Sequence, residues 1–293
     1  MTKQTHSKGI ICGMLAAISY AANPLFAVPM LAEGIHVNSI LFYRYFLGAL
    51  LYGALLLCVR RRRLSVSLRE LAGLAILALM FSYSSICLFA AFQYIDMGIS
   101  CTILFIYPSM VAVISFLFFG EKPSKSVLLA ILLSTCGVAL LSKGSGEINT
   151  QGVLLSLCSA LLYALYIVGV RQMKSIRRVK SDKLNFYVML LGLLVYICNL
   201  RFCADLQLLH TPFLWGCAIL LAIIPTIISL ESLTISIKLI GSTKAAIIGA
   251  MEPMCAILIG VTLFHEKLTW SIIVGFILIV TGVILTVTRR KKA

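Results

Sequence analysis

Charged side chains are scarce in this sequence. Only 12% of its 293 residues are Asp, Glu, Lys or Arg, whereas 61% are hydrophobic. An ordinary soluble domain has about 25% charged and roughly 45–50% apolar residues. The composition therefore excludes an ordinary soluble fold and indicates a protein that crosses the lipid bilayer several times.

Several chemical motifs are also missing. The sequence has no Gly-x-x-x-x-Gly-Lys-Ser/Thr loop, the motif that binds nucleotide phosphates. It therefore lacks this type of site for a nucleotide whose hydrolysis would supply energy. Its ten cysteines include no Cys-x-x-Cys pair, and its four histidines are scattered, at positions 6, 36, 210 and 265. We therefore expect no metal, no cofactor and no enzyme activity.

Acidic residues are few: the sequence has 10 Asp and Glu and 25 Lys and Arg, which gives a net charge of +15. The basic residues form short clusters between apolar runs, a pattern typical of membrane topology signals, so we expect no nucleic-acid partner. With a cytoplasmic N-terminus, the outside loops contain only Lys143, Arg201 and Lys267, and Arg44 lies within an apolar run. The positive-inside rule then places both termini in the cytoplasm, in a multi-pass protein of the cytoplasmic membrane.

About 20 mostly apolar residues span a bilayer as a helix. On that scale the sequence has ten such segments, at 9–31, 37–59, 71–94, 99–119, 124–142, 152–170, 184–200, 213–236, 243–263 and 270–288. The connections between them are short. The sequence thus predicts an all-α integral membrane protein of ten transmembrane helices whose function lies inside the bundle.

One pattern occurs twice in the chain. Phe119-Gly120-Glu121-Lys122 recurs 145 residues later as Phe264-His265-Glu266-Lys267, and the same offset pairs Ile95 with Ile240, Pro108 with Pro253 and Gly137 with Gly282. We infer two repeats of five helices, 1–145 and 146–293. Since five is odd, the second repeat is inverted, as in many secondary transporters. Glu121 and Glu266 then face opposite compartments, as gate or structural residues.

Two prolines at matching positions suggest a site at mid-bilayer. In Tyr107-Pro108 and Glu252-Pro253, each proline is expected to bend its helix and free a carbonyl, which is tolerated where the backbone lines a cavity. Packing kinks without a ligand are the alternative. The carboxylate of Glu252 is costly in the membrane, so we expect it to contact a substrate amine, carry a proton or accept a structural hydrogen bond.

Two further charges lie within apolar runs. Arg44 is a candidate for binding an anionic group, with a structural lock between helices as the alternative. Glu231 is expected near the cytoplasmic side, with Lys238 or Lys244 as its partner, in a gate or a structural salt bridge.

The segments at 9–31 and 152–170 match at an offset of 143. This offset pairs Gly9 with Gly152 in a close packing seam, and Tyr20 with Tyr163, which are candidates for the cavity wall. Gln93 and three serines give the segment at 71–94 a polar stripe that is a candidate for pore lining. Hydrogen bonds between helices are the alternative for these groups.

Together these residues resemble the EamA family of the drug/metabolite transporter superfamily. The resemblance rests on Gly-Glu-Lys-Pro at 120–123, on Met251-Glu252-Pro253, on the Gly-Val pairs at 137–138 and 282–283, and on Phe42-Tyr43-Arg44. It implies a central cavity lined by the first, third, fourth, sixth, eighth and ninth helices, and export or exchange of small polar metabolites such as amino acids. His265 departs from the first copy, which has Gly120.

We therefore expect a secondary transporter, most plausibly an exporter, that works by alternating access. Its substrate site is expected to include Tyr107, Glu252, Tyr20, Tyr163, Arg44 and Gln93. Coupling to protons stays open at this point, as does the oligomeric state. The alternatives are a membrane channel and a non-transporting membrane interaction protein.

Overall fold

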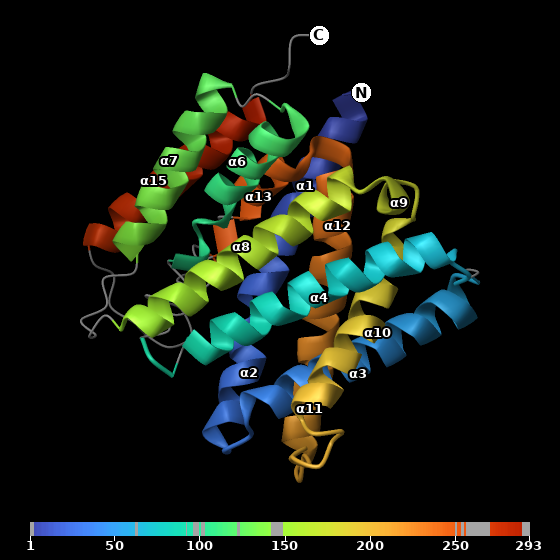
Figure 1. Cartoon of the computed structure of the whole chain (residues 1–293). Coiled ribbons are helices and arrows are strands. Elements are labelled where there is room, and N and C mark those ends of the chain that lie inside the picture. The colour runs from blue at the N-terminus through green and yellow to red at the C-terminus, as the bar shows by residue number, and fades with distance from the viewer. Residues whose placement is uncertain are drawn as a thin grey trace.

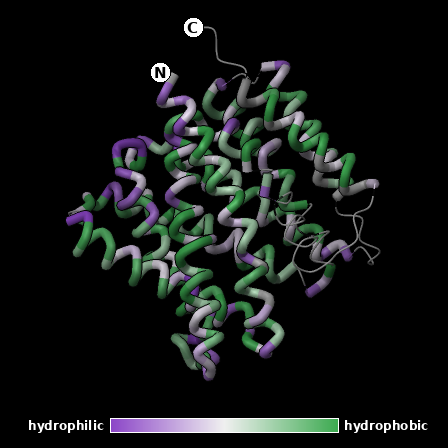
Figure 2. The backbone as a smooth tube through the Cα atoms, turned by 180° about the vertical axis from the view of Figure 1, so that it is seen from behind, coloured by the Kyte–Doolittle hydropathy of each residue, from purple (hydrophilic) through white to green (hydrophobic). Residues whose placement is uncertain are grey.

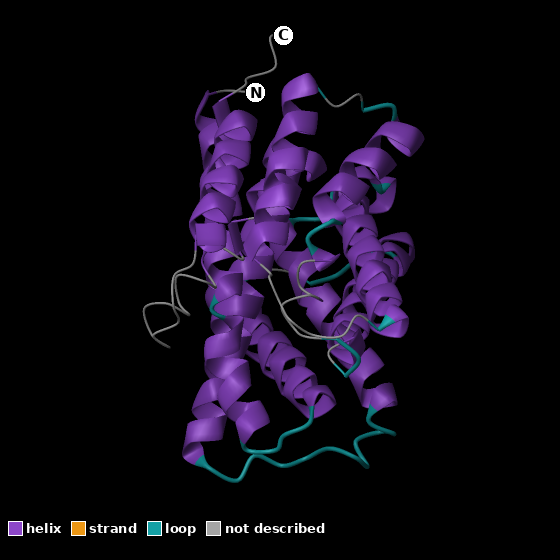
Figure 3. Cartoon of the chain, turned by 90° about the vertical axis from the view of Figure 1, so that its left-hand side faces the viewer, coloured by secondary structure: helices purple, strands orange, loops and turns teal. Residues whose placement is uncertain are grey.

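The computed structural model describes residues 3–61, 64–91, 93–95, 100, 103–121, 124–141, 149–249, 251–252, 255 and 270–288. Within these residues the regular secondary structure is entirely helical (Figure 3). The all-α prediction is confirmed for the described chain.

Figure 1 shows how the described helices are arranged. They are α1 (Lys3–Ala21), α2 (Asn23–Ala32), α3 (Val37–Ala54), the π-helical η1 (Leu55–Val59), α4 (Leu68–Ala91), α6 (Tyr107–Phe119), α7 (Lys125–Leu141), α8 (Thr150–Gln172), α9 (Lys174–Arg177), α10 (Ser181–Asn199), α11 (Pro212–Ala222), the π-helical η2 (Ile223–Ile228), α12 (Ser229–Ile240), α13 (Ser242–Gly249) and α15 (Trp270–Thr288).

Six stretches of the described chain are long and apolar enough to cross a membrane. They are Gln4–Ala32, Val37–Val59, Leu68–Ala91, Thr150–Gln172, Ser181–Asn199 and Pro212–Ile240. Three apolar helices are shorter, at Tyr107–Phe119, Lys125–Gly137 and Ile273–Gly282. The six agree with predicted segments, while the total of ten spans stays a prediction.

Local sequence explains several helix ends. The Asn149 side chain accepts a hydrogen bond from Gln151 N at 2.8 Å and starts α8, and Thr211 Oγ1 accepts one from Leu214 N at 3.2 Å and starts α11. Both are good N-cap residues because their side-chain oxygens replace missing helical acceptors. Gly120 ends α6 with φ of +65°, a backbone conformation that glycine adopts at little cost.

The fourth predicted segment is interrupted at Pro108. Residues 103–104 are helical, 105–106 form a turn, and α6 begins at Tyr107, so Pro108 occupies its first turn, and its role as a helix bend stays a prediction. A proline is favourable there, because the first helical N–H groups have no intrahelical acceptor in any case. The chain therefore breaks just before Pro108.

The packing of the helices follows the internal repeat. α1 packs on α12 and α4 packs on α8, while α7 pairs with α15 and α6 with α13. In the repeat, α1 corresponds to the first part of α8, and α4 corresponds to the continuous helical stretch Pro212–Ile240, of which α12 is the last part. The α1–α12 and α4–α8 pairs are thus equivalent contacts, related by exchange of the two halves.

Individual contacts obey the same exchange. A Cβ added at Gly9 would lie 2.5 Å from Ile240 Cγ2, and one added at Gly152 would lie 2.8 Å from Ile95 Cγ2. Because the repeat pairs Gly9 with Gly152 and Ile95 with Ile240, these are the same contact made twice. Both glycines let two helices approach closely.

A pair of hydrogen bonds repeats this arrangement. Ser84 Oγ donates to Ser159 O at 2.9 Å, and Ser229 Oγ donates to Ala16 O at 3.1 Å. Ser84 and Ser229 differ by the offset of 145, and Ala16 and Ser159 by the offset of 143. The two halves therefore share their helix-to-helix contacts, which supports the predicted inverted repeat.

The N-terminal end of α1 and the C-terminal end of α15 lie at the same end of the molecule (Figure 1), and Figure 2 shows the start of the chain there as hydrophilic. There Arg171 Nη1 donates to Lys238 O at 2.6 Å, Lys238 Nζ donates to Val179 O, and Lys183 Nζ donates to Ser65 O at 2.9 Å. We call this the basic end, defined by Arg60, Arg171, Lys183 and Lys238. It agrees with the predicted grouping of the cytoplasmic loops.

A loop is fastened to the other end of the bundle. Gln207 N donates to Ser39 Oγ at 3.1 Å, Gln207 Nε2 donates to Gly34 O at 3.3 Å, and Tyr43 Oη donates to Gln207 O at 3.1 Å. These bonds tie the α10–α11 connection to the first turns of α3 and to the connection between α2 and α3. We call this the Gln207 end.

The paired seams give a testable prediction. Replacing Gly9 or Gly152 by Leu should lower the free energy of unfolding by about 1–3 kcal/mol each, because the new side chain overpacks a helix contact. The control is Gly216→Leu on α11, where an added Cβ would meet nothing within 4 Å. Thermal unfolding in detergent measures the three variants, and seam variants as stable as the control would contradict the close packing.

Candidate functional site

Arg44 is the buried charge around which the site is built. It lies on α3 and is only 3% exposed. Its Nε donates to Thr226 Oγ1 at 2.7 Å, its Nη2 donates to Pro225 O at 3.2 Å, and its guanidinium lies 5.4 Å from the centre of the Tyr20 ring. The charge thus receives two oxygen acceptors and one aromatic face, which offset the cost of removing it from water.

The sequence Pro225-Thr226 creates these acceptors. Proline has no N–H to donate to the preceding helical turn. The Thr226 hydroxyl donates instead to Leu221 O at 2.8 Å, and the helix widens into the π-helical η2. The same hydroxyl oxygen accepts the bond from Arg44, and the widened turn leaves Pro225 O accessible to its guanidinium. π-helical turns are frequent at functional sites.

Tyrosines from two helices, Tyr107 of α6 and Tyr163 of α8, meet within the bundle. The Tyr107 and Tyr163 rings are 4.8 Å apart in an edge-to-face arrangement, and Tyr107 Oη donates to Ala246 O at 3.1 Å. Gly249 makes room for this hydroxyl, since an added Cβ there would clash with Tyr107 Oη. Tyr107 is thereby fixed between α6 and α13.

Glu252 completes the group. It is partly buried, and electrostatic interactions connect it with Arg44, Tyr107 and Tyr163. We call Tyr20, Arg44, Tyr107, Tyr163 and Glu252 the central cluster. Five of the six predicted substrate-site residues thus come together, although they are far apart in the sequence.

Gln93 does not join the central cluster. α4 ends at Ala91, and Gln93 is exposed in the turn that follows. Its neighbour Tyr94 accepts a hydrogen bond from Gln151 Nε2 at 3.3 Å, at the start of α8. Pro253 and Glu266, the remaining residues of the predicted site and gates, lie outside the described residues.

The predicted gate residues that the structure describes, Glu231, Lys244 and Glu121, lie toward the basic end, with one correction. Glu231 was expected to pair with Lys238 or Lys244, but its Oε1 forms an ion pair with Arg60 Nη1 at 2.8 Å. Lys238 donates to Val179 O, and Lys244 Nζ lies 3.4 Å from His6 Nε2. Glu121 Oε1 accepts a bond from Gln172 Nε2 at 2.8 Å.

Two surface cavities lie at the ends of the bundle. One of about 500 Å³ at the Gln207 end is lined by His36, Asn38, Asn199, Leu200, Asp205 and Gln207. One of about 600 Å³ near the basic end is lined by Ser67, Arg69, Glu70, Met173, Lys174, Ser175 and Arg178. Neither is lined by a residue of the central cluster, which is therefore not part of either cavity.

The sequence analysis missed Thr226 and Gln207. A proline followed by threonine within the apolar run at 213–236 is the signal that could have located the acceptors of Arg44. Gln207 had no signal, because its role depends on a loop meeting distant residues.

These features define a multi-pass helical membrane protein with charged and aromatic groups gathered inside its bundle. The sequence profile of the EamA-like transporter family matches residues 7–143 and again residues 150–288. The chain belongs to this family, within the drug/metabolite transporter superfamily, and it is a membrane transporter.

Two relatives agree with this assignment, and one solved structure shares the fold. An uncharacterized transporter of Archaeoglobus fulgidus is 29% identical over 220 residues, which cover 74% of this chain and 76% of that protein. The uncharacterized transporter YvbV of Bacillus subtilis is 29% identical over 206 residues, which cover 68% of this chain and 66% of that protein. A protein crystal structure with 15% identity has a TM-score of 0.80 and covers 95% and 96% of the two chains, which shows the shared fold.

The ion pair at the basic end gives a second prediction. Its side chains are 38% and 22% exposed, so water screens their attraction. A double-mutant cycle with Arg60→Gln and Glu231→Gln should yield a coupling of only about 0.2–1 kcal/mol in thermal unfolding. A coupling well above that range would show that the pair stabilises the fold far more than a partly exposed contact allows.

Proposed function

We propose that this protein is a secondary transporter that exports small polar metabolites, amino acids or related compounds, by alternating access. The observation that carries this proposal is the central cluster. It combines a cation, a carboxyl group and three tyrosines within one bundle, and groups of this kind are rare inside membranes unless they serve function.

The chemistry of the cluster fits a zwitterion. The Arg44 guanidinium is suited to a carboxylate, because it is planar and offers several N–H donors. Glu252 is suited to an amine, and the tyrosine rings offer apolar faces with polar tips. Arg44 is already bound to Thr226 and Pro225, so the substrate meets a preorganised cation at low entropic cost.

The internal repeat is suited to alternating access. Ten spans in two inverted halves would let the same contacts close either end, since each helix pair of one half has an equivalent in the other. In this scheme Arg60–Glu231 and Glu121–Gln172 close the basic end, and the Gln207 bonds close the opposite end. The basic end is cytoplasmic in the proposed orientation in the cytoplasmic membrane.

Substrate counterflow in proteoliposomes tests this function. A screen of labelled amino acids, nucleosides and organic cations should find saturable exchange of an amino acid or a close relative. Glu252→Gln and Arg44→Lys should each lower this exchange by about tenfold or more, the effect of losing roughly 1.4 kcal/mol of binding or transition-state energy.

Arg177→Lys is the matched control, because Arg177 is exposed on α9 and lies outside the central cluster. It should retain native exchange. Flux without saturation or counterflow would indicate a channel instead, and no flux for any compound would favour the non-transporting interaction protein. Native exchange in Glu252→Gln would remove the carboxylate from the substrate site.

A further inference from the structure

The cavity near the basic end has no part in the proposed transport cycle. It has a volume of about 600 Å³ and lies between the start of α4 and the short helix α9, which pack on each other (Figure 1). Ligand sites commonly have volumes of about 300–1,000 Å³. Three basic side chains line the cavity: Arg69 comes from α4, Lys174 from α9, and Arg178 directly follows α9. The cavity therefore presents positive charge from two elements to any molecule that enters it.

Close packing holds α9 against α4. Ile176 of α9 is fully buried. Gly73 of α4 makes this approach possible, because a Cβ added there would lie 2.6 Å from Ser175 Oγ and 3.0 Å from Ile176 Cδ1. Lys174 and Arg178 stand on either side of this buried anchor. Their backbone positions on the cavity wall are therefore set by the packing.

The carboxylate of Glu70 also lines the cavity, but it is engaged within its own helix. Ser67 N and Ser67 Oγ donate to Glu70 Oε2 at 2.7 and 2.9 Å, and Glu70 N donates to Ser67 Oγ at 3.3 Å. This is a capping box, which satisfies the first N–H groups of α4. Among the residues that the structure describes, no carboxylate pairs with the side chain of Arg69, Lys174 or Arg178. The wall thus has an excess of unpaired positive charge, which suits an anion.

The cavity lies at the depth of the lipid headgroups. Arg69 is the second residue of the apolar stretch Leu68–Ala91, and Lys174 comes two residues after the stretch Thr150–Gln172. Both stretches are long enough to cross a membrane, so their ends mark the boundary between the hydrocarbon core and the headgroups. Basic pockets between transmembrane helices at such a boundary bind the phosphate groups of lipids.

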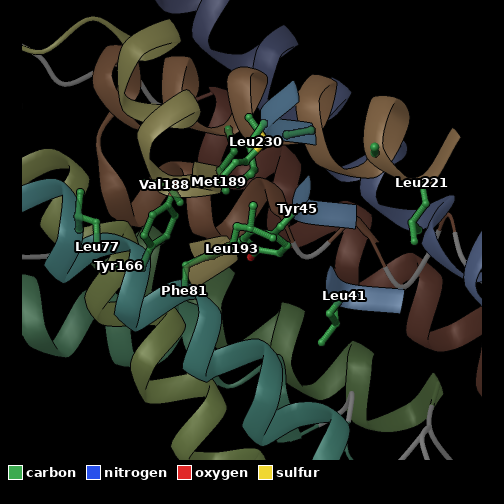
Figure 4. Packing of buried hydrophobic residues seen from close by; sticks show 14 of the residues in the cluster. Leu41, Tyr45, Leu77, Phe81, Tyr166, Val188, Met189, Leu193, Leu221 and Leu230 are labelled. Atoms are coloured by element: carbon green, nitrogen blue, oxygen red, sulfur yellow. The ribbon is translucent and has the colours of Figure 1, made fainter. Parts of the chain in front are cut away.

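The side of α4 that begins at this cavity is apolar and exposed. Its members are spaced by eight, three and four residues, which places them on one side of the helix; they are Leu68, Ile76, Leu79 and Tyr83. The opposite side is buried, where Leu77 and Phe81 belong to the hydrophobic cluster (Figure 4). We call the exposed side the outer face of α4. It runs from the cavity away from the basic end, the course that the acyl chains of a lipid held in the cavity would take.

We propose that Arg69, Lys174 and Arg178 bind the phosphate group of an anionic lipid in the leaflet at the basic end, while its acyl chains lie along the outer face of α4. Guanidinium and ammonium groups form charge-assisted hydrogen bonds with phosphate oxygens. Arg69 belongs to the first repeat and the other two cations belong to the second, so the phosphate group joins the two halves of the bundle. The site is separate from the central cluster and does not depend on which substrate is carried.

Native mass spectrometry of the full chain in detergent tests this site. Titration with phosphatidylglycerol should show a single lipid bound about tenfold or more tightly than phosphatidylcholine, whose own cation balances the phosphate charge. Loss of one basic residue of the cavity should weaken the binding of phosphatidylglycerol by about fivefold, and loss of all three should abolish the preference. The variants are Arg69→Gln, Lys174→Gln and Arg178→Gln, singly and together. All three side chains are exposed, so the variants should unfold at the native temperature when no lipid is added.

The matched control removes the same charge from exposed residues that do not line the cavity, in the combined variant Lys125→Gln, Arg177→Gln and Lys180→Gln. It should keep the native preference for phosphatidylglycerol. An equal loss in the two combined variants would show general attraction to a basic surface and would overturn the site. Equal binding of both lipids by the native chain would overturn it as well.

Two further measurements examine the source of the phosphate and its contact with both halves. sn-Glycerol 3-phosphate, which has the phosphate group without acyl chains, should not displace the lipid at equal concentration, and displacement would contradict a lipid as the ligand. Phosphatidylglycerol should raise the unfolding temperature of the native chain and of the control, because it binds the folded state and joins the two halves. The same rise in the variant that lacks all three cations would contradict the proposed contacts.

Discussion

The structure depends on a cation kept within an apolar bundle. Arg44 is held there because Pro225 interrupts a helix and Thr226 supplies both a donor to Leu221 O and an acceptor for the guanidinium. Without these oxygens, a buried charge would be costly enough to distort the fold or to exclude the residue. The same residues lie in the π-helical turn that joins α11 to α12, so the site and this change of helix type have a single cause.

The second constraint is the internal repeat, which the family profile matches twice. Each half repeats the same two contacts. One is the close approach of a glycine to an isoleucine, Gly9 to Ile240 and Gly152 to Ile95. The other is a serine hydroxyl that donates to a backbone carbonyl, Ala16 O or Ser159 O. Equivalent seams give the two halves similar energies of packing. In the proposed mechanism, such a bundle alternates between two related arrangements.

Much of this organisation could be predicted from the sequence, because it rests on apolar length and on a repeat without gaps. Arg44, Tyr107 and Glu252 could be predicted as site residues, since charges and prolines within apolar runs are exceptional. The ion-pair partner of Glu231 could not be predicted, because Arg60 belongs to a cluster of basic residues whose long side chains can extend in several directions. Gln93 was grouped with α4 by its polar stripe, but the helix ends at Ala91 and the next residues form a turn. Thr226 forms its contacts only after the π-helical turn has formed.

The most direct test of alternating access measures distances at the two ends in the same samples. Electron spin resonance would use labels on encoded unnatural amino acids at two pairs of exposed sites. One pair is Lys125 and Lys174 toward the basic end, and the other is Glu33 and Trp270 toward the opposite end. Addition of a transported substrate should change the two distances in opposite senses, with one end opening as the other closes. Distances that change together, or that do not change, would contradict the account.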